Sequence, residues 1–234
     1  AHDLAIKSLK ANILPKGLFE VEGEETLETN LFGMKLPNPI GLAAGFDKSA
    51  EVYNSLFKFG FGFVEVGTVT PKRQLGNPKP RIFRLEKDMA LINRLGFNNH
   101  GSEIISKRIS NNHPNGILGI NIGPNKDTQN KEEDYYICLS RLSIYSHYIT
   151  INISSPNTEG LRNIHDQKEM IKLFTGLNKI KKEKRINTPI AVKLSPDIND
   201  LDISGIIELI NKYNIHGIII SNTTDSNRKN LSDV

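Results

Sequence analysis

Apolar and polar side chains alternate in six short runs along the chain. Successive side chains of a strand point to opposite faces, so each run predicts a strand. In the most regular run, residues 148–153, isoleucine occupies every second position, with threonine, asparagine and serine between. Taken alone, that run also fits an antiparallel strand with its polar face in water. The six predicted strands are residues 39–44, 63–66, 117–122, 148–153, 189–194 and 216–221.

Helical patterns, with apolar residues three and four positions apart, lie between these runs. Strand alternating with helix predicts βαβ units and a parallel sheet. Residues 71–98 contain three prolines and predict an insertion that forms a hairpin over the site, and residues 25–32 predict a short β segment before Gly33. The predicted helices are residues 49–59, 102–110, 132–146, 166–184 and 200–213.

One face of each predicted strand is apolar, and the other carries a polar or small residue near the C-terminal end, such as Asn121 between two isoleucines. The central strands of a doubly wound sheet are covered on both faces and are apolar on both. A (β/α)8 TIM barrel is covered only outside, and its interior turns polar at the C-terminal mouth. We therefore predict an α/β fold, a TIM barrel with about six βα units present and its C-terminal units missing, because a whole barrel takes about 250 residues.

The N-terminal residues predict a short helix that precedes the barrel. Ala5, Ile6 and Leu9 share one face of residues 1–14, and Pro15 ends the pattern. This helix either packs on its own domain or faces a membrane or partner. We expect residues 1–24 to form a helical extension facing quinone and membrane, and residues 25–234 to form the barrel.

Composition narrows the class of protein only slightly. The chain has 234 residues, of which 38% are hydrophobic and 24% charged, enough for one sizeable core. The net charge of +4 suits an anionic small ligand or a membrane surface, and no block of like charges predicts nucleic-acid binding. The single cysteine, Cys138, predicts no internal disulfide, and no apolar run reaches the roughly 20 residues of a membrane span.

Lys193 is the most unusual residue of the predicted strands. It interrupts the apolar run 189–194, and a lysine is rarely buried without a partner. It either forms an internal ion pair with Glu65, which is predicted to point inward, or is itself the cation that binds a ligand anion.

Four asparagines lie at the ends of predicted strands: Asn121, Asn152, Asn157 and Asn222. An amide offers donors and an acceptor without charge, which suits a flat heterocycle carrying carbonyl and N–H groups. Asparagine is also common in turns, which explains Asn157 but not the two residues within strands.

Asp47 and Lys48 open the first predicted barrel helix. Asp47 either caps that helix beside an exposed lysine, or the pair places Lys48 at the barrel mouth. The sequence has no Walker motif, no complete dinucleotide fingerprint and no zinc-ligand spacing, so no metal site is predicted. Ser155 has no histidine near it in sequence, which argues against a hydrolase triad.

Several motifs, in order, carry a family resemblance: GLAAGFDK at 41–48, EVGTVTP at 65–71, NRLGFN at 93–98, GINIG at 119–123, NISSPN at 152–157 and SNTT at 221–224. From His2 to about Thr224 the chain resembles dihydroorotate dehydrogenase. The N-terminal helix and Ser155 resemble class 2, which is quinone-dependent and membrane-associated.

The resemblance implies an FMN-dependent TIM barrel that oxidises dihydroorotate to orotate in pyrimidine (UMP) biosynthesis and passes electrons to ubiquinone or menaquinone. It implies a peripheral position on the inner membrane of a bacterium, or on the mitochondrial inner membrane of a eukaryote, with the N-terminal helix against the membrane surface. The soluble class uses cysteine where Ser155 stands, and Cys138, in a predicted helix, cannot fill that place.

By resemblance, Ser155 is the catalytic base, supported by Thr158 and Phe97. The implied quinone contacts are His2 and Arg84. The implied substrate contacts are Lys48, Asn93, Arg94, Leu95, Gly96, Phe97, Asn152, Asn157, Asn222 and Thr223. The implied FMN contacts are Ala44, Gly45, Phe46, Asp47, Lys48, Thr68, Asn121, Asn152, Lys193 and Ser221, the last at a position where the family usually has threonine.

The sequence lacks the glycine-rich turns after strands seven and eight that hold the FMN phosphate in this family. We therefore expect the 234-residue chain, made alone, to lack the yellow spectrum of bound flavin. Two alternatives are another FMN-barrel pyrimidine reductase, which the stretch 155–157 argues against, and a non-catalytic truncated barrel. Flavin content separates an enzyme from a fragment.

Overall fold

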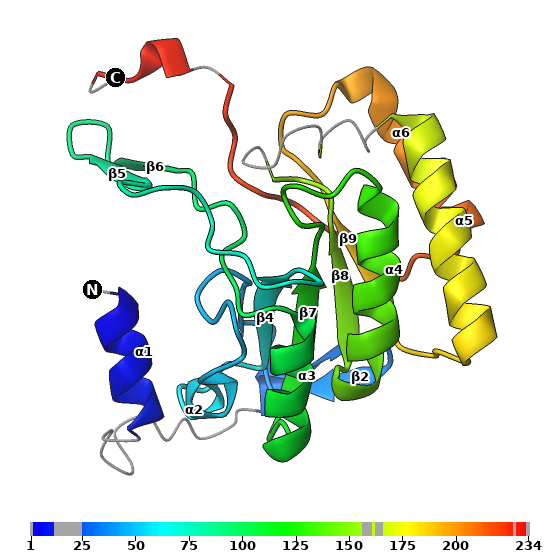
Figure 1. The fold of residues 1–234 in the computed structure, drawn as a ribbon, viewed down its shortest axis with the longest axis horizontal. Helices are drawn as coiled ribbons and strands as arrows, with labels where there is room; N and C mark the ends of the chain where they lie inside the picture. The colour runs from blue at the N-terminus through cyan, green and yellow to red at the C-terminus, as the bar shows by residue number, and fades with distance from the viewer. Residues whose placement is uncertain (1, 12–24, 156–160, 162–165, 227, 233–234) are drawn as a thin grey trace.

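The computed structural model describes residues 2–11, 25–155, 161, 166–226 and 228–232. Six parallel strands form one curled sheet in the order β10-β9-β8-β7-β4-β3 (Figure 1). Each strand pairs with its neighbours in the order of the chain, as in a barrel, and all six predicted strands are confirmed. The strands are β3 (Gly41–Leu42), β4 (Phe63–Val69), β7 (Ile117–Ile122), β8 (Tyr148–Asn152), β9 (Ile190–Lys193) and β10 (Gly217–Ile219).

Helices follow the strands and cover the outer face of the sheet (Figure 1). The first is shorter than predicted, because Ala50 has a left-handed φ of 51° and delays the helix to Tyr53. The helix predicted at 132–146 ends at Leu142 and continues as a 3₁₀ turn, Ser143–Tyr145. The barrel helices are α2 (Tyr53–Phe57), α3 (Ser102–Asn111), α4 (Lys131–Leu142), α5 (Gln167–Lys184) and α6 (Asp200–Lys212).

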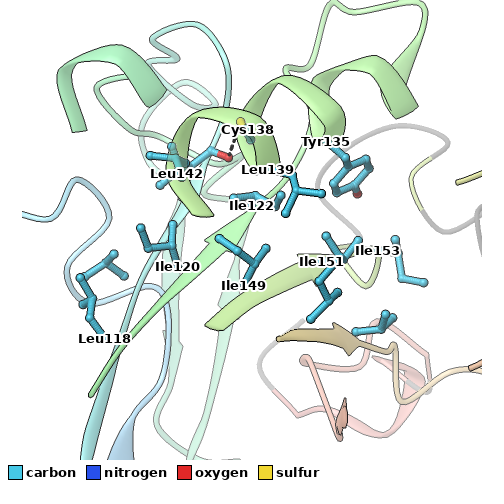
Figure 2. Close-up of a cluster of buried hydrophobic side chains, with 14 of the residues drawn as sticks. Leu118, Ile120, Ile122, Tyr135, Cys138, Leu139, Leu142, Ile149, Ile151 and Ile153 are labelled. Carbon is cyan, nitrogen blue, oxygen red and sulfur yellow. Dashed lines mark hydrogen bonds between the residues drawn. The ribbon is translucent and has the colours of Figure 1, made fainter. Parts of the chain in front are cut away.

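Isoleucine and leucine side chains form the core between the sheet and α4. Alternate residues of β7 and β8, including Ile120 and Ile151, are fully buried and point toward Leu139 and Cys138 of the helix (Figure 2). Cys138 lies in a helix, as predicted, where it is buried in the core, and burial raises the pKa of its thiol. The polar residues between these positions therefore point to the inside of the curled sheet.

Aromatic rings line the inside at the N-terminal ends of the strands, around a cavity of about 390 Å³. The rings of Phe32 and Phe63 lie 5.7 and 6.4 Å from that of Tyr148. Phe32 comes from a hairpin of β1 (Thr29–Leu31) and β2 (Met34–Leu36). The β segment predicted at 25–32 is confirmed only from Thr29 on, since Glu25–Leu27 is a 3₁₀ turn. Gly119 pairs with Tyr148, and a Cβ there would lie 2.1 Å from the ring, so only glycine fits. Glu65 and Lys193 line this cavity together with the rings.

The insertion between β4 and β7 is a hairpin, as predicted: β5 (Ile82–Leu85) pairs antiparallel with β6 (Ala90–Asn93). Two buried amides tie its base to the sheet. Asn99 Nδ2 donates to the hydroxyl of Thr70, directly after β4 (2.8 Å), and Asn125 Nδ2, from the segment after β7, donates to the carbonyl of Lys72 (3.0 Å). The hairpin is therefore anchored beside the C-terminal ends of the strands.

The N-terminal helix α1 (His2–Lys10) packs on the barrel. Ile6 and Leu9 are buried, and the Ser55 hydroxyl donates to the Leu9 carbonyl (3.1 Å). The predicted apolar face therefore contacts its own domain, while Leu4 is exposed. No helix in the described part of the chain is long and apolar enough to cross a membrane. Ala1 and residues 12–24 of the predicted extension lie outside the described residues.

A buried leucine of α4 tests the core. We predict that Leu139→Ala lowers the free energy of unfolding by about 2–5 kcal/mol, because it leaves a cavity beside the β7 and β8 isoleucines. Leu201→Ala on α6, where the side chain is 85% exposed, is the matched control and should change it by less than about 0.5 kcal/mol. Urea unfolding measures both, and equal losses would contradict the assigned core.

Two histidines each accept a hydrogen bond from a backbone N–H of the neighbouring strand. Nδ1 of His147 accepts from the Leu118 N–H (3.1 Å), and Nδ1 of His216 accepts from the Ile190 N–H (3.2 Å). Burial lowers the pKa of both rings, and Lys181 lowers that of His216 further. The folded state therefore binds fewer protons than the unfolded chain at these two sites.

We predict that these histidines cost the protein stability in mild acid. Their contribution is complete above the unfolded pKa of about 6.5 and is lost as the pH falls below it, because a protonated Nδ1 cannot accept a hydrogen bond. In the double variant His147→Asn/His216→Asn, an amide oxygen can accept in place of Nδ1 without titrating. Urea unfolding between about pH 7.5 and 5.5 should show a shallower decline in this variant. An unchanged slope would contradict the assignment.

Candidate functional site

A cavity of about 360 Å³ lies at the C-terminal ends of the strands. Loops after β3, β4, β8, β9 and β10 form its walls, together with the chain that leaves the hairpin after β6. The structure therefore gathers residues from six segments that are far apart in sequence. The predicted site residues that line it are Ala44, Gly45, Lys48, Thr68, Asn93, Leu95, Gly96, Phe97, Asn152, Ser155, Lys193, Ser221, Asn222 and Thr223.

Other predicted residues lie elsewhere. Arg94 points away from the cavity, donating from Nε and Nη2 to the Pro80 carbonyl (3.0 and 2.8 Å) and stacking over Phe83. Arg84 is exposed on β5. Asn157 and Thr158 lie outside the described residues. Phe46 and Asp47 line a second cavity rather than this one, and Asn121 lies beneath the first cavity within the sheet.

A buried carboxylate organises the polar interior below the cavity. Glu65 accepts hydrogen bonds from three neutral groups: Asn121 Nδ2 at 2.9 Å, the Tyr148 hydroxyl at 3.0 Å and the Thr150 hydroxyl at 2.8 Å. Burial and the adjacent Glu65 charge raise the pKa of Tyr148, which keeps its proton available for donation. The carboxylate therefore joins β4, β7 and β8 through the inside of the sheet.

The network continues upward to the cavity. Asn121 Oδ1 accepts from the Thr68 hydroxyl (2.7 Å) and from Asn152 Nδ2 (3.2 Å). Asn152 Oδ1 accepts from the Ser154 hydroxyl (2.8 Å), whose oxygen accepts from Asn222 Nδ2 (3.0 Å). Each of these amides has its orientation set by partners on another segment. The polar wall is therefore preorganised in the protein itself.

Lys193 does not pair with Glu65, so the predicted ion-pair alternative is wrong. Glu65 is occupied by three neutral donors, and β7 and β8 separate the two strands in the sheet. Within the described ranges, no hydrogen bond or ion pair involves the Lys193 ammonium group. The half-buried lysine lines the cavity, as the alternative of a cation held for a ligand predicts.

The two alternatives for Asp47 and Lys48 both hold in part: Asp47 shapes the start of the helix, and Lys48 lies at the mouth of the barrel. The Asp47 carboxylate accepts from the N–H groups of Glu51 (2.8 Å) and Val52 (2.7 Å), so it shapes the turn before α2. Burial nevertheless raises its pKa. Lys48 donates to the Gly45 carbonyl and lines the cavity, and burial, with Arg81 nearby, lowers the pKa of its ammonium group.

A second cavity, of about 350 Å³, lies between α1 and the barrel. His2 lies within it, with Nε2 2.7 Å from the Phe46 carbonyl oxygen and its ring edge-on to that of Phe46. Lys48 and Asn98 line both cavities, so the two share a wall. The exposed Arg84 is not part of the second lining.

Asn98 and Gly67 also line the first cavity, and sequence reasoning did not select them. Asn98 Oδ1 is buried without a hydrogen-bond partner among the described residues. Its place at the end of the NRLGFN motif, residues 93–98, was the available signal. Gly67 has a φ of 110°, and a Cβ there would lie 2.4 Å from the Asn121 carbonyl oxygen. In the described part of the chain no three His, Cys, Asp or Glu residues cluster as a metal site.

The fold and the cavity define a partial (β/α) barrel with a polar ligand site at the mouth. The sequence matches the model of the dihydroorotate dehydrogenase family over residues 26–233, and the chain belongs to that family. It is 44% identical over 228 residues to the dihydroorotate dehydrogenase (quinone) of Bartonella tribocorum, and 46% identical over 213 residues to that of Christiangramia forsetii.

The same fold occurs in a solved relative. The crystal structure of DHODH from Eimeria tenella in complex with ferulenol superposes with a TM-score of 0.90 at 36% identity, covering 99% of this chain and 68% of that one. The Bartonella protein is matched over 96% of this chain but 62% of its own length, and the Christiangramia protein over 90% and 62%. The chain thus spans less than two thirds of these curated relatives.

The Glu65 network gives a direct test. We predict that Glu65→Ala lowers the free energy of unfolding by about 3 kcal/mol or more, because three buried donors lose their acceptor. Glu65→Gln, which keeps one acceptor oxygen, should cost less. The control is Glu208→Ala, an exposed carboxylate on α6. Urea unfolding ranks the three variants. If Glu65→Ala is as stable as Glu208→Ala, the network is contradicted.

Proposed function

We propose that this chain forms the substrate face of an FMN-dependent dihydroorotate dehydrogenase that passes electrons to a quinone in pyrimidine biosynthesis. The observation that carries the proposal is the cavity itself. Fixed amides, a lysine without a partner among the described residues, and a buried serine converge there from the ends of strands. Family membership and relatives named for this reaction support it.

The residues of the cavity fit a flavin. Gly45 and Gly67 present backbone without side chains, and a Cβ on Gly45 would meet nothing within 4 Å, so a flat ring can approach. Thr68 and Asn152 offer uncharged polar contacts to ring carbonyl and N–H groups, with Asn121 holding them from below. Lys193 supplies a cation beside the ring.

When bound, FMN would take the hydride that leaves C6 of dihydroorotate. Lys193 would stabilise the negative charge that develops on the acceptor. Asn93, Asn222 and Thr223 would orient the pyrimidine carbonyls and its carboxylate, with Lys48 binding from the β3 side. Because hydrogen bonds already fix Asn152 and Asn222, these amides need little reorganisation when the substrate binds.

Ser155 would accept the proton from C5 of dihydroorotate through its hydroxyl oxygen. The side chain is buried and lines the cavity at the end of β8. A serine hydroxyl is a weak base at its ordinary pKa, so the proton must move onward through a hydrogen-bonded relay. By resemblance, Thr158 and Phe97 lie around that relay, and the Phe97 carbonyl accepts a hydrogen bond from Asn99 at the cavity wall.

The quinone would occupy the cavity between α1 and the barrel. His2 and Phe46 line this space, which adjoins the first cavity at Lys48 and Asn98. We propose residues 1–24 as the extension that offers this entrance to a membrane surface, peripheral on a bacterial inner membrane or a mitochondrial inner membrane. Residues 25–234 would then be the flavin-binding barrel.

Ser155→Ala tests the proposal. We predict that, in the full-length protein, this variant keeps its flavin absorbance but bleaches with dihydroorotate at least about a hundredfold more slowly, because the base is lost. The control is Ser110→Ala on α3, away from the cavity. Rapid-mixing absorbance measures the rate.

Unchanged bleaching in Ser155→Ala would remove Ser155 from the base role. A full-length protein without flavin would favour the non-catalytic alternative. Bound flavin that is bleached by another dihydropyrimidine, but not by dihydroorotate, would favour a different pyrimidine reductase.

A further inference from the structure

Three cavity residues, Ser221, Asn222 and Thr223, belong to a segment without helix or strand that follows β10. On the cavity side, the Asn222 N–H donates to the Leu194 carbonyl (3.2 Å) and Asn222 Nδ2 donates to the Ser154 hydroxyl (3.0 Å). These bonds join it to the ends of β8 and β9. The geometry of the segment therefore also depends on the contacts of its C-terminal part, residues 224–226.

Asp197 holds that end. It lies in the loop between β9 and α6, and its carboxylate accepts from three consecutive residues. Oδ1 accepts from the hydroxyls of Thr224 and Ser226 (2.8 Å for Ser226), and Oδ2 accepts from the Asp225 N–H (3.1 Å). The three donors start one residue after Thr223. One charged acceptor thus gathers the chain directly beyond the cavity wall.

Asp197 is itself held in place. Its N–H donates to the hydroxyl of the buried Ser195 (3.1 Å), two residues after Lys193. Burial alone would raise the pKa of the Asp197 carboxyl, but the bonds from Thr224, Asp225 and Ser226 hold it far below its usual range. The carboxylate therefore stays ionised and able to accept all three bonds at neutral pH.

We propose that Asp197 is a positioning residue for the pyrimidine site: by holding residues 224–226 it fixes Asn222 and Thr223 at the cavity wall. The inference rests on the proposed function, since it takes dihydroorotate and orotate as the ligands of those two side chains. Asp197 is exposed and outside the cavity lining, so it acts through the segment rather than by contact with the ligand.

The physical consequence concerns alignment more than folding. Without Asp197, Asn222 keeps its bonds to Leu194 and Ser154, but Thr223 loses the support on its C-terminal side. Small displacements of positioning groups can cost up to about a hundredfold in rate or affinity. The loss should therefore appear in ligand affinity before it appears in stability.

The test uses the full-length protein with its flavin and compares Asp197→Ala, Asp197→Asn and a matched control, Asp200→Asn. Asp200 is an exposed carboxylate at the start of α6, three residues away, and makes no bond to residues 221–226 within the described chain. The Asn variant keeps one oxygen for the hydroxyls but turns an amide N–H₂ toward the Asp225 N–H. Three quantities are measured: the Kd of orotate, KM and kcat with dihydroorotate, and hydrogen exchange of the backbone N–H groups of residues 222–226.

For Asp197→Ala we expect a rise of about tenfold or more in the orotate Kd and in KM, with a much smaller change in kcat and faster exchange in residues 222–226. Asp197→Asn should lie between this variant and the parent, and Asp200→Asn should match the parent. If Asp197→Ala does not fold, the same comparison is made with Asp197→Asn.

Faster exchange with unchanged Kd and KM would overturn the inference, because the clamp would then order the segment without positioning the site. Unchanged exchange would overturn it as well. If the parent protein itself fails to bind orotate, the proposed function fails and the substrate part of this inference falls with it. Hydrogen exchange then still decides whether Asp197 holds the segment.

Discussion

The buried Glu65 carboxylate and its three neutral donors set the character of the interior. A charge without a partner inside the sheet would be too costly to keep, and an ion pair with Lys193 would take that cation away from the cavity it lines. Three hydrogen bonds from Asn121, Tyr148 and Thr150 satisfy the charge instead. They hold three strands in register from within, where isoleucines hold them from outside.

A chain of hydrogen bonds runs from this carboxylate toward the mouth of the barrel. Each step uses an amide or a hydroxyl that both donates and accepts, so that Asn121 fixes Asn152, Asn152 fixes Ser154, and Ser154 fixes Asn222. The segments that line the cavity are irregular, yet Ser154 after β8 and Asn222 after β10 are held in place by the strands below. Rigid elements support the site, and the loops supply its chemistry.

Much of the fold and part of the site could be predicted from sequence, because both depend on strand alternation. Ile151 outside and Asn152 inside follow from period two and from the choice of a barrel. Other features depend on loop backbone or on register across strands. Arg94 donates to the Pro80 carbonyl, and the left-handed backbone at Ala50 delays a helix. Tyr148 and Thr150 are aligned so that they donate to Glu65 in place of Lys193. No local pattern encodes these choices.

The shared wall between the two cavities has a consequence for any two molecules held there. Lys48 and Asn98 each face both spaces, so the partition is a single layer of side chains. Occupants on either side would be separate enough never to exchange atoms, yet near enough for electrons to pass between them. A partition of this kind would let one protein carry out two half-reactions in separate cavities, one at the mouth of the sheet and the other between α1 and the barrel.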